Sequence, residues 1–348
     1  MPDGSQMRSE VAVVLPCYNA ESTLQRALDS VFAQTYRNCH VCAVDDGSTD
    51  RTLEVLAANS HRCSYLSQIH RGPAAARNRA IQMSNSPFLA FLDADDRWLP
   101  AKLQRQMALL QEQPDVGLVC STCLLGESEK EGGRVLPRNG DVTGRLFQEL
   151  ASNCFVFTPT VVIRRGCLED VGLFRESLAV SEDFNLWLRI AARWRIAYLQ
   201  EPLVVVHKRP ASLSATVPDA ERLKNGIAAL EDVRATCGQL SPLEARALAK
   251  ALAERFYFYG SFLLKTGGKA PARKALASSL SFRMSHWRAL AKLAASFLPL
   301  RLFQSLLHGI TKSRRRSRIR QLTPRKSTDV ARFDSVTDRK ESAGDRYF

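Results

Sequence analysis

Residues 86–96 read SPFLAFLDADD, an apolar run followed at once by three carboxylates, Asp93, Asp95 and Asp96. Like charges this close repel one another, and apolar surroundings make their ionisation costly. Residues two apart in an extended segment point to the same side, so Asp93 and Asp95 can face one cation. Mg²⁺ and Mn²⁺ prefer hard oxygen ligands of this kind. The stretch therefore predicts a buried strand that ends in a divalent-metal site.

The chain before this stretch alternates between strand and helix patterns. A β-branched apolar run typical of a strand buried on both faces occupies residues 11–16, and further strands are predicted at 40–45, 64–69 and 86–93. Apolar residues at helical spacing lie between them, at 22–34, 48–59 and 74–84. This alternation predicts a parallel, doubly wound α/β sheet. In such sheets, ligands bind outside the carboxyl ends of the strands.

A polar or turn-forming segment follows each predicted strand. These segments are PCYNAES at 16–22, DDGSTD at 45–50, HRGPAAARN at 70–78 and DADD at 93–96. Each has an ordinary structural explanation alone, because DxD triplets arise by chance and DDGSTD can be a turn before a helix. Their occurrence in this order, each at a strand end, is far more specific. We therefore expect Asp45, Asp46 and the DADD acids to converge at one sheet edge.

The overall composition is that of a globular protein. The 348 residues are 45% hydrophobic and 24% charged, enough for one large domain and a smaller one. The opening MPDGSQMRSE lacks the apolar segment of a secretory signal, and no window predicts a transmembrane helix. Nine cysteines are expected to be reduced core residues, since the single CxxC, Cys120 and Cys123, has no second pair to complete a zinc site.

The positive charge is concentrated in the C-terminal part. The net charge is +14, yet residues 255–328 alone contain 17 Lys and Arg and no Asp or Glu, so the remainder is slightly acidic. Helical patterns occupy 218–310, and an apolar stripe lies beside basic residues within them, at Leu290, Leu293, Phe297 and Leu300. Residues 285–326 are therefore predicted to contact an anionic membrane surface. Packing of these helices on the preceding domain is the alternative, and no motif supports nucleic-acid binding.

The motifs together resemble the family 2 glycosyltransferases with the A-type fold. The segments that carry the resemblance are VVLPCYNAESTLQRALDSVFAQTY, VDDGSTDRT, RGPAAARNRAI, FLDADDRWLP and SEDFNLWLRIA, within roughly residues 10–215. The resemblance implies a doubly wound, mixed but mostly parallel α/β sheet with a C-terminal helical extension. It also implies transfer of a sugar from a nucleotide-diphosphate donor to a hydroxyl acceptor, with inversion and with Mg²⁺ or Mn²⁺.

The resemblance also assigns expected roles to residues. Asp46 would receive the N–H of the nucleotide base, and Asp93 and Asp95 would hold the metal, Asp95 by the more direct contact. His207 or Arg209 would reach the diphosphate or the metal, although a structural role for His207 is an equal alternative. The full set expected to bind nucleotide is Pro16, Tyr18, Asn19, Glu21, Asp45, Asp46, Arg71 and Asp93.

The catalytic base is expected on a separate helix, predicted at 181–193. A hydroxyl acceptor needs a base that removes its proton as it attacks, and inversion places that base opposite the leaving group. Asp183 matches the family's base, and its neighbour Glu182 is the rival. Ser181 is expected to cap this helix, and the structural alternative is that both acids only stabilise the helix start. Trp187 could stack on a sugar or lie in the core.

These expectations give a domain plan and a function. The plan is a disordered N-terminus at 1–9, a catalytic domain at 10–217, helices at 218–310 and a basic, then mixed-charge disordered tail at 311–348. The expected function is glycosyl transfer, with a hexose the expected sugar, in cell-surface polysaccharide, lipopolysaccharide or lipid-linked glycan synthesis, peripherally on the cytoplasmic face of the inner membrane. The acceptor could be a lipid-linked saccharide. The alternatives are an inactive nucleotide-sugar binding protein with a basic membrane-surface module, or a basic interaction protein.

Overall fold

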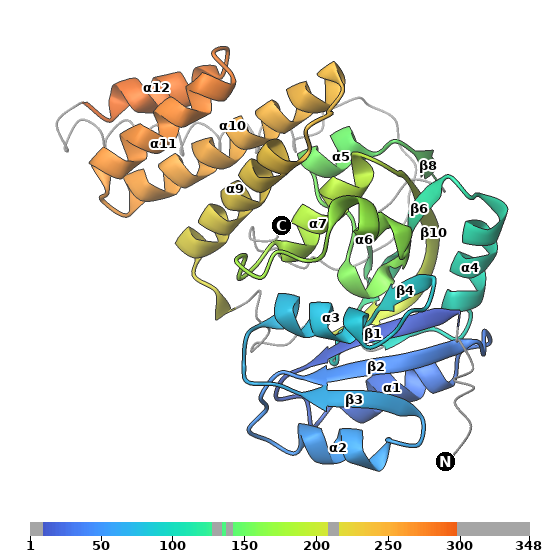
Figure 1. Cartoon of the computed structure of the whole chain (residues 1–348). Coiled ribbons are helices and arrows are strands. Elements are labelled where there is room, and N and C mark those ends of the chain that lie inside the picture. The colour runs from blue at the N-terminus through green and yellow to red at the C-terminus, as the bar shows by residue number, and fades with distance from the viewer. Residues whose placement is uncertain (1–9, 127–133, 137–141, 208–215, 298–348) are drawn as a thin grey trace, which may run out of the picture.

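A mixed ten-stranded sheet forms the centre of the computed structural model, which describes residues 10–126, 134–136, 142–207 and 216–297 (Figure 1). Its main strand order is β3-β2-β1-β4-β9-β6-β10-β5, with β7 beside β6 and β8 beside β10. The strands are β1 Val11–Cys17, β2 Cys39–Asp45, β3 Cys63–Ser67, β4 Phe88–Phe91, β5 Arg97–Trp98, β6 Val116–Leu125, β7 Arg134–Leu136, β8 Val142–Gly144, β9 Val162–Arg164 and β10 Arg195–Val206.

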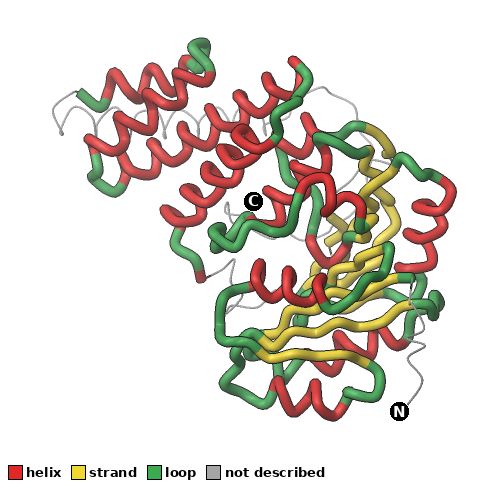
Figure 2. Tube along the Cα trace, in the orientation of Figure 1, coloured by secondary structure: helices red, strands yellow, loops and turns green. Residues whose placement is uncertain are grey.

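Helices connect the strands and continue beyond them (Figure 2). Those of the sheet region are α1 Leu24–Phe32, α2 Thr52–Ala58, α3 Pro73–Gln82, α4 Lys102–Glu112, α5 Phe147–Ser152, the 3₁₀ turn η2 Thr158–Thr160, α6 Gly166–Val171 and α7 Glu182–Ala191. Those of the C-terminal region are α9 Asp219–Thr236, α10 Pro242–Lys265, α11 Lys269–Phe282 and α12 Trp287–Ala295. The predicted mostly parallel sheet with a C-terminal helical extension is therefore confirmed.

The four predicted strands form one parallel block. Strand β1 pairs in parallel with β2 and with β4, and β2 pairs in parallel with β3. Alternate residues of β1 belong to different cores: Ala12 and Val14 face one, whereas Val11, Val13 and Leu15 face the other. A strand with helices over both faces has to be apolar at every position, which is why 11–16 is continuously hydrophobic.

The second half of the sheet runs partly against this direction. Strand β9 is antiparallel to both β4 and β6, and β10 is parallel to β6. The last strand of this half, β10, is long and irregular. Its pairing shifts between Leu199 and Pro202, where the proline has no N–H to donate to the ladder.

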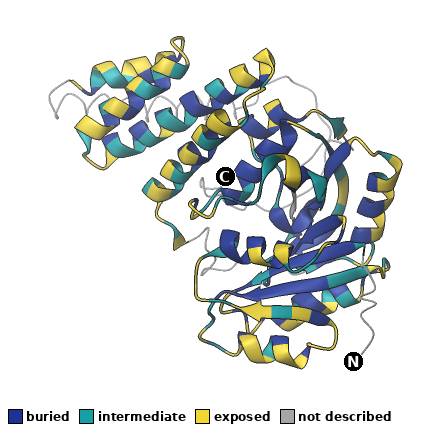
Figure 3. Cartoon of the chain, viewed as in Figure 1, coloured by how far each residue is buried: buried dark blue, intermediate teal, exposed yellow. Residues whose placement is uncertain are grey.

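Among the C-terminal helices, α9 and the first part of α10 pack against the sheet region. Leu230 of α9 and Leu248 of α10 belong to the same core as β1, but the far end of α10 forms a separate small core with α11 and α12. This core consists of Tyr257, Leu264, Ala272, Leu276 and Ala289. Figure 3 shows many exposed positions along these helices. Within the described ranges, no helix has the length and hydropathy needed to span a bilayer.

Candidate active site

The loops after β1 and β2 lock together at the carboxyl edge of the sheet. Asn19, whose φ of 47° is left-handed, donates its N–H to Ser48 Oγ (2.9 Å), and its side-chain oxygen accepts from the Thr49 N–H (2.8 Å). Glu21 Oε2 accepts from the Arg51 N–H at 3.0 Å. Asn19 and Glu21 thus link the PCYNAES and DDGSTD segments by hydrogen bonds. Such contacts fix the loop that carries Tyr18.

Asp46, at the end of the second segment, is 2% exposed and surrounded by donors. Its carboxylate accepts from Gln68 Nε2 (2.7 Å) and from the backbone N–H groups of Arg71 (3.0 Å) and Gly72 (2.8 Å), and His70 Nδ1 lies 2.9 Å from Oδ2. A carboxylate offers about four acceptor positions, so these contacts fill it. A nucleotide base that donates to Asp46 therefore has to replace one of them.

His70 also covers the ring of Tyr18. The two rings stack with centroids 4.2 Å apart and planes 27° apart, while Tyr18 remains 48% exposed. Pro16 lies one residue inside β1, opposite Val44 of β2. Asp45 accepts from the Ser48 N–H (3.2 Å) and from Ser67 Oγ (2.9 Å), so its carboxylate stabilises the turn after β2. Tyr18 and His70 form the aromatic surface nearest to Asp46.

The three DADD acids have different surroundings. Asp96 is buried and accepts from the His207 N–H at 2.9 Å; burial and the charges of Asp93 and Asp95 raise its pKa well above the usual value. Asp93 keeps 28% of its side chain exposed, and Asp95 is half-buried. The clustering is thus tolerated because one acid is enclosed as a structural acceptor and two face the open edge.

The described residues contain no group of three or more His, Cys, Asp or Glu side chains placed to hold a metal. Asp93 and Asp95, both half-buried, are the two carboxylates that would hold a cation at this edge. That donor set fits a cation that keeps water and substrate phosphate oxygens as its other ligands. His207 is near this group through its backbone N–H bond to Asp96. Arg209 lies outside the described residues.

Arg77 of α3 joins the DADD loop to the first turn of α7. Its Nη2 donates to Asp93 Oδ1 and its Nη1 to Glu182 Oε1, each at 2.7 Å. Arg77 is 6% exposed. Burial lowers its pKa, but the carboxylates of Asp93 and Glu182 outweigh that effect and raise it. The guanidinium therefore stays charged inside the protein.

The two adjacent acids of α7 differ in exposure. Glu182 is buried against Arg77; burial and the charge of Asp183 raise its pKa, and Arg77 opposes the shift. Asp183 is half-buried, with Oδ2 accepting from Thr158 Oγ1 at 2.9 Å. The cap prediction for Ser181 was wrong: its backbone is left-handed (φ 70°), and its side chain makes no capping bond. An N-cap oxygen reaches the helix amides from an extended conformation instead.

The segment before α7 is tied to α3. Arg71 Nη2 pairs with Glu176 Oε2 at 2.8 Å, and Asn78 Nδ2 donates to the carbonyl of Phe174 and to Glu176 Oε1, both at 3.0 Å. Trp187 is fully buried with its ring edge-on to Phe91 and Phe174, which settles it as a core residue. Arg71 is therefore held toward the α6–α7 segment.

Sequence reasoning missed four residues that complete this edge: His70, Arg77, Thr158 and Glu176. Arg77 had a visible signal, because it stands among alanines on the buried side of α3. The others had none, since their partners are distant in sequence. The loop motifs were found, but not the side chains that join them.

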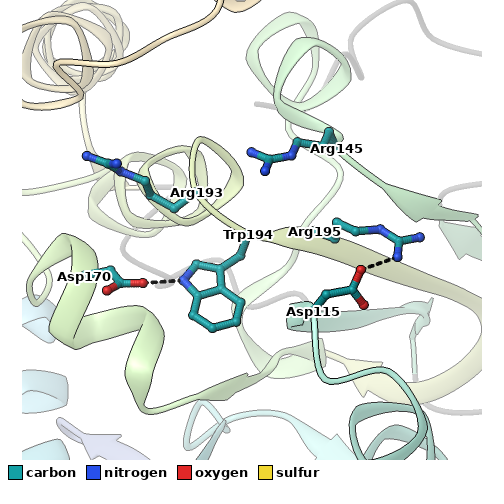
Figure 4. Close-up of a pocket in the computed structure, with 6 residues that line it drawn as sticks. All are labelled: Asp115, Arg145, Asp170, Arg193, Trp194 and Arg195. Atoms are coloured by element: carbon teal, nitrogen blue, oxygen red, sulfur yellow. Dashed lines mark hydrogen bonds and ion pairs between the residues drawn. The ribbon is translucent and has the colours of Figure 1, made fainter.

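A pocket of about 580 Å³ lies elsewhere (Figure 4). Arg195 begins β10 and Asp115 precedes β6, so this pocket is at the amino edge of the strands that run parallel to β4. Its acids are already paired, Asp115 with Arg195 Nη1 (2.5 Å) and Asp170 with Trp194 Nε1 (2.8 Å). The predicted site residues are at the other edge, so we do not assign the site to this pocket.

Comparison with known proteins identifies the class. The model of glycosyl transferase family 2 matches residues 12–172. WfgD of Escherichia coli, a UDP-Glc:alpha-D-GlcNAc-diphosphoundecaprenol beta-1,3-glucosyltransferase, is 32% identical over 182 residues, 52% of this chain and 69% of that protein. The chain belongs to glycosyl transferase family 2.

Two further relatives either are much longer than this chain or have lower sequence identity to it. An uncharacterized glycosyltransferase of Rickettsia felis is 30% identical over 197 residues, but the match spans 56% of this chain and only 32% of that protein. AmsB of Erwinia amylovora, an amylovoran biosynthesis glycosyltransferase, is 28% identical over 208 residues, 56% of this chain and 69% of that protein. The chain thus spans about a third of the Rickettsia relative's length.

Solved structures share the fold. S. aureus TarS 1–349, crystallised with UDP-GlcNAc, superposes with a TM-score of 0.64 at 20% identity, covering 83% of this chain and 89% of that one. The mannosyltransferase PcManGT of Pyrobaculum calidifontis, crystallised with GDP-Man and Mn²⁺, gives 0.52 at 21% identity, covering 86% and 83%. These likenesses confirm the A-type glycosyltransferase fold.

Proposed function

We propose that the protein transfers a hexose from a nucleotide-diphosphate donor to a hydroxyl acceptor, with inversion. The observation that carries the proposal is the Arg77 bridge. It places the DADD acids and the first turn of α7 on either side of one buried guanidinium. An acid pair for the donor and a base for the acceptor are thereby brought to the same sheet edge from separate elements. Inversion requires this separation of base and leaving group.

The donor lies between the DDGSTD loop and the DADD loop in this proposal. The nucleotide base stacks on Tyr18 and donates a hydrogen bond to Asp46, so it replaces His70 at both residues. Arg71 approaches the nucleotide from the 70–72 turn. Uracil is the first base to test, because WfgD is named for UDP-Glc and TarS was crystallised with UDP-GlcNAc. Base stacking on an aromatic ring contributes on the order of 1–3 kcal/mol in other nucleotide sites.

The diphosphate and a divalent cation meet at Asp93 and Asp95. Mg²⁺ or Mn²⁺ bound there would offset the negative charge that develops on the leaving diphosphate. The Mn²⁺ in the PcManGT complex supports this choice of metal class. Asp95 is proposed as the more direct ligand, and Asp93 as the acid that is shared between the metal and Arg77.

Asp183 acts as the base. It is half-buried and accepts from the Thr158 hydroxyl, whereas Glu182 is enclosed by Arg77. Neighbouring residues on a helix point about 100° apart, so only one of the two can aim at the acceptor. The geometry favours Asp183 taking the acceptor proton as the oxygen attacks the sugar.

The acceptor is a saccharide carried on an anionic membrane surface. Residues 285–326 bind that surface and so keep the enzyme close to the acceptor. Of these, the structure describes 285–297. Trp287 is 72% exposed and Leu290 55%, beside Arg288, whereas Leu293 packs partly into the small core. An exposed aromatic and aliphatic pair next to cations suits the bilayer interface. The diphosphoundecaprenol acceptor in the name of WfgD supports a lipid-linked substrate.

A donor screen tests the proposal. Thermal unfolding of the full chain is followed with UDP-glucose, UDP-GlcNAc and GDP-mannose, each with and without Mn²⁺, and nucleotide release is measured in parallel. We expect one donor to raise Tm only with Mn²⁺ and to be turned over. Stabilisation without any release of nucleotide, across a range of saccharide acceptors, would favour the inactive binding protein instead. No stabilisation by any sugar nucleotide would contradict the proposal.

A further inference from the structure

Arg77 has surroundings that a helix-surface arginine does not have. It lies on the same helix as Arg79, which is exposed, yet Arg77 is buried and reaches two carboxylates from two other elements. Its Nε has no hydrogen-bond partner within the described residues. Burying a guanidinium is costly unless its charge is matched, and here both matching charges belong to the candidate site.

We propose that Arg77 is a positioning residue that holds Asp93 and the first turn of α7 in register, with Glu182 as its counter-ion. The proposal rests on the function proposed above, because it assigns Asp93 to the donor side and Asp183 to the acceptor side. Planar guanidinium groups can bond two carboxylates at fixed angles, which lysine cannot do. Movement of the donor acid would thus be transmitted to the helix that carries the base.

The bridge has a separate consequence at each end. At the donor end, Arg77 fills one acceptor position on Asp93 Oδ1 and fixes the orientation of the carboxylate, whose other positions remain for the donor side. At the acceptor end, Glu182 Oε1 is taken and its side chain is buried, so Glu182 cannot approach an acceptor. Asp183, the next residue, is only half-buried, and its carboxylate accepts from Thr158 Oγ1 and from the Phe184 N–H. Arg77 thereby separates two adjacent acids into counter-ion and base.

The charge balance gives a test by double substitution. Arg77→Met leaves the Glu182 carboxylate buried without its cation, which is strongly destabilising. Adding Glu182→Gln to that variant removes the uncompensated charge. We therefore expect Glu182→Gln to lower Tm in the natural protein but to raise it in the Arg77→Met background. Arg79→Met is the matched control, and it should leave Tm unchanged.

Kinetics separate the two ends of the bridge. With UDP-glucose or UDP-GlcNAc and Mn²⁺, we expect Arg77→Met to lower kcat for UDP release and to raise the donor KM, each by about tenfold or more, the range for lost charge-assisted hydrogen bonds. In the double variant kcat should recover in large part, because the α7 turn is relieved, while the donor KM stays raised, because Asp93 still lacks its partner. A purely structural role would move both quantities together.

The outcomes decide the proposal in each case. Equal Tm effects of Glu182→Gln in both backgrounds, or an unchanged kcat and KM in Arg77→Met, would overturn it. If Arg77→Met does not fold, Arg77→Lys keeps the charge, and we expect it to fold and still to show a raised donor KM; natural kinetics in Arg77→Lys would overturn the proposal. A natural protein that neither binds nor cleaves either donor would count against the proposed function alone, since the Tm cycle still measures the bridge.

Discussion

The sheet region and the last helices bury their side chains differently, and the contrast bears on function. Around the sheet, two large cores enclose apolar residues on both faces, and even charged side chains such as Arg77 and Glu182 are enclosed with partners. The unit formed by the far end of α10 with α11 and α12 has a hydrophobic core of only five residues and leaves Met284, Trp287, Leu290 and Phe297 exposed. A rigid interior can hold acids at fixed positions, whereas exposed apolar side chains remain available for contacts that the described residues do not make.

The largest expected effect lies in the sheet region. Asp95→Asn keeps the shape of the side chain but removes a charge from the proposed two-carboxylate metal site. We expect the turnover of the sugar nucleotide to fall by roughly 10³-fold, because metal stabilisation of a leaving group contributes several kcal/mol. The measurement is UDP release against Mn²⁺ concentration. An unchanged metal requirement would show that the DADD acids do not hold the metal.

A smaller effect tests whether the two regions are independent. A Cβ on Gly260 would lie 2.8 Å from Leu276 Cγ and 3.1 Å from the Ala272 carbonyl oxygen, at the α10–α11 contact. Overpacking of this kind costs about 1–3 kcal/mol, so Gly260→Ala should loosen α11 and α12. We expect a separate low-temperature unfolding step in calorimetry with UDP binding preserved.

A matched substitution in the sheet region completes this test. A Cβ on Gly117 would meet Trp194 and Cys167 at 2.6 Å, inside the main core. Gly117→Ala should therefore lower the main unfolding temperature and weaken UDP binding together. Loss of UDP binding in Gly260→Ala would show that the helical unit supports the site and would remove the contrast between the regions.

The smallest expected effect concerns the membrane surface. Replacing exposed Trp287 and Leu290 by serine should reduce binding to vesicles of anionic lipid by several-fold, since each buried apolar side chain contributes on the order of 1.5–3 kcal/mol but these are only partly inserted. Leu243→Ser, at a 62% exposed leucine of α10, is the control. Equal vesicle sedimentation for the double variant and the natural protein would favour packing or another partner for this face.

Much of the sheet region could be predicted from the sequence, because its signals are local. Continuous apolar runs marked the buried strands, and the polar segments after them marked the carboxyl edge where Asp46, Asp93 and Asp183 now lie. The pairings that join these segments could not be predicted. Arg77 and Glu182 are 105 positions apart, as are Arg71 and Glu176, and no local pattern pairs them.

The helical stripe was predicted less well for a related reason. Leu290 and Leu293 share a stripe by helical spacing, yet Leu293 packs against the small core and Leu290 is exposed. Periodicity gives the apolar face of a helix but not how far a neighbouring helix covers it. The position of α11 decides this, and it depends on the long-range contact at Gly260.

Donor binding and proton removal are assigned to different residues, and Asp183→Asn should affect only the second. UDP binding with Mn²⁺ is measured by calorimetry. The rate of UDP release from the sugar nucleotide that the protein cleaves is measured on the same preparation. We expect nearly natural UDP affinity with turnover reduced by roughly 10²- to 10⁴-fold, the usual contribution of general-base catalysis. Turnover near the natural rate in Asp183→Asn, or a loss of UDP binding as large as the loss of turnover, would contradict the assignment of Asp183 as the base.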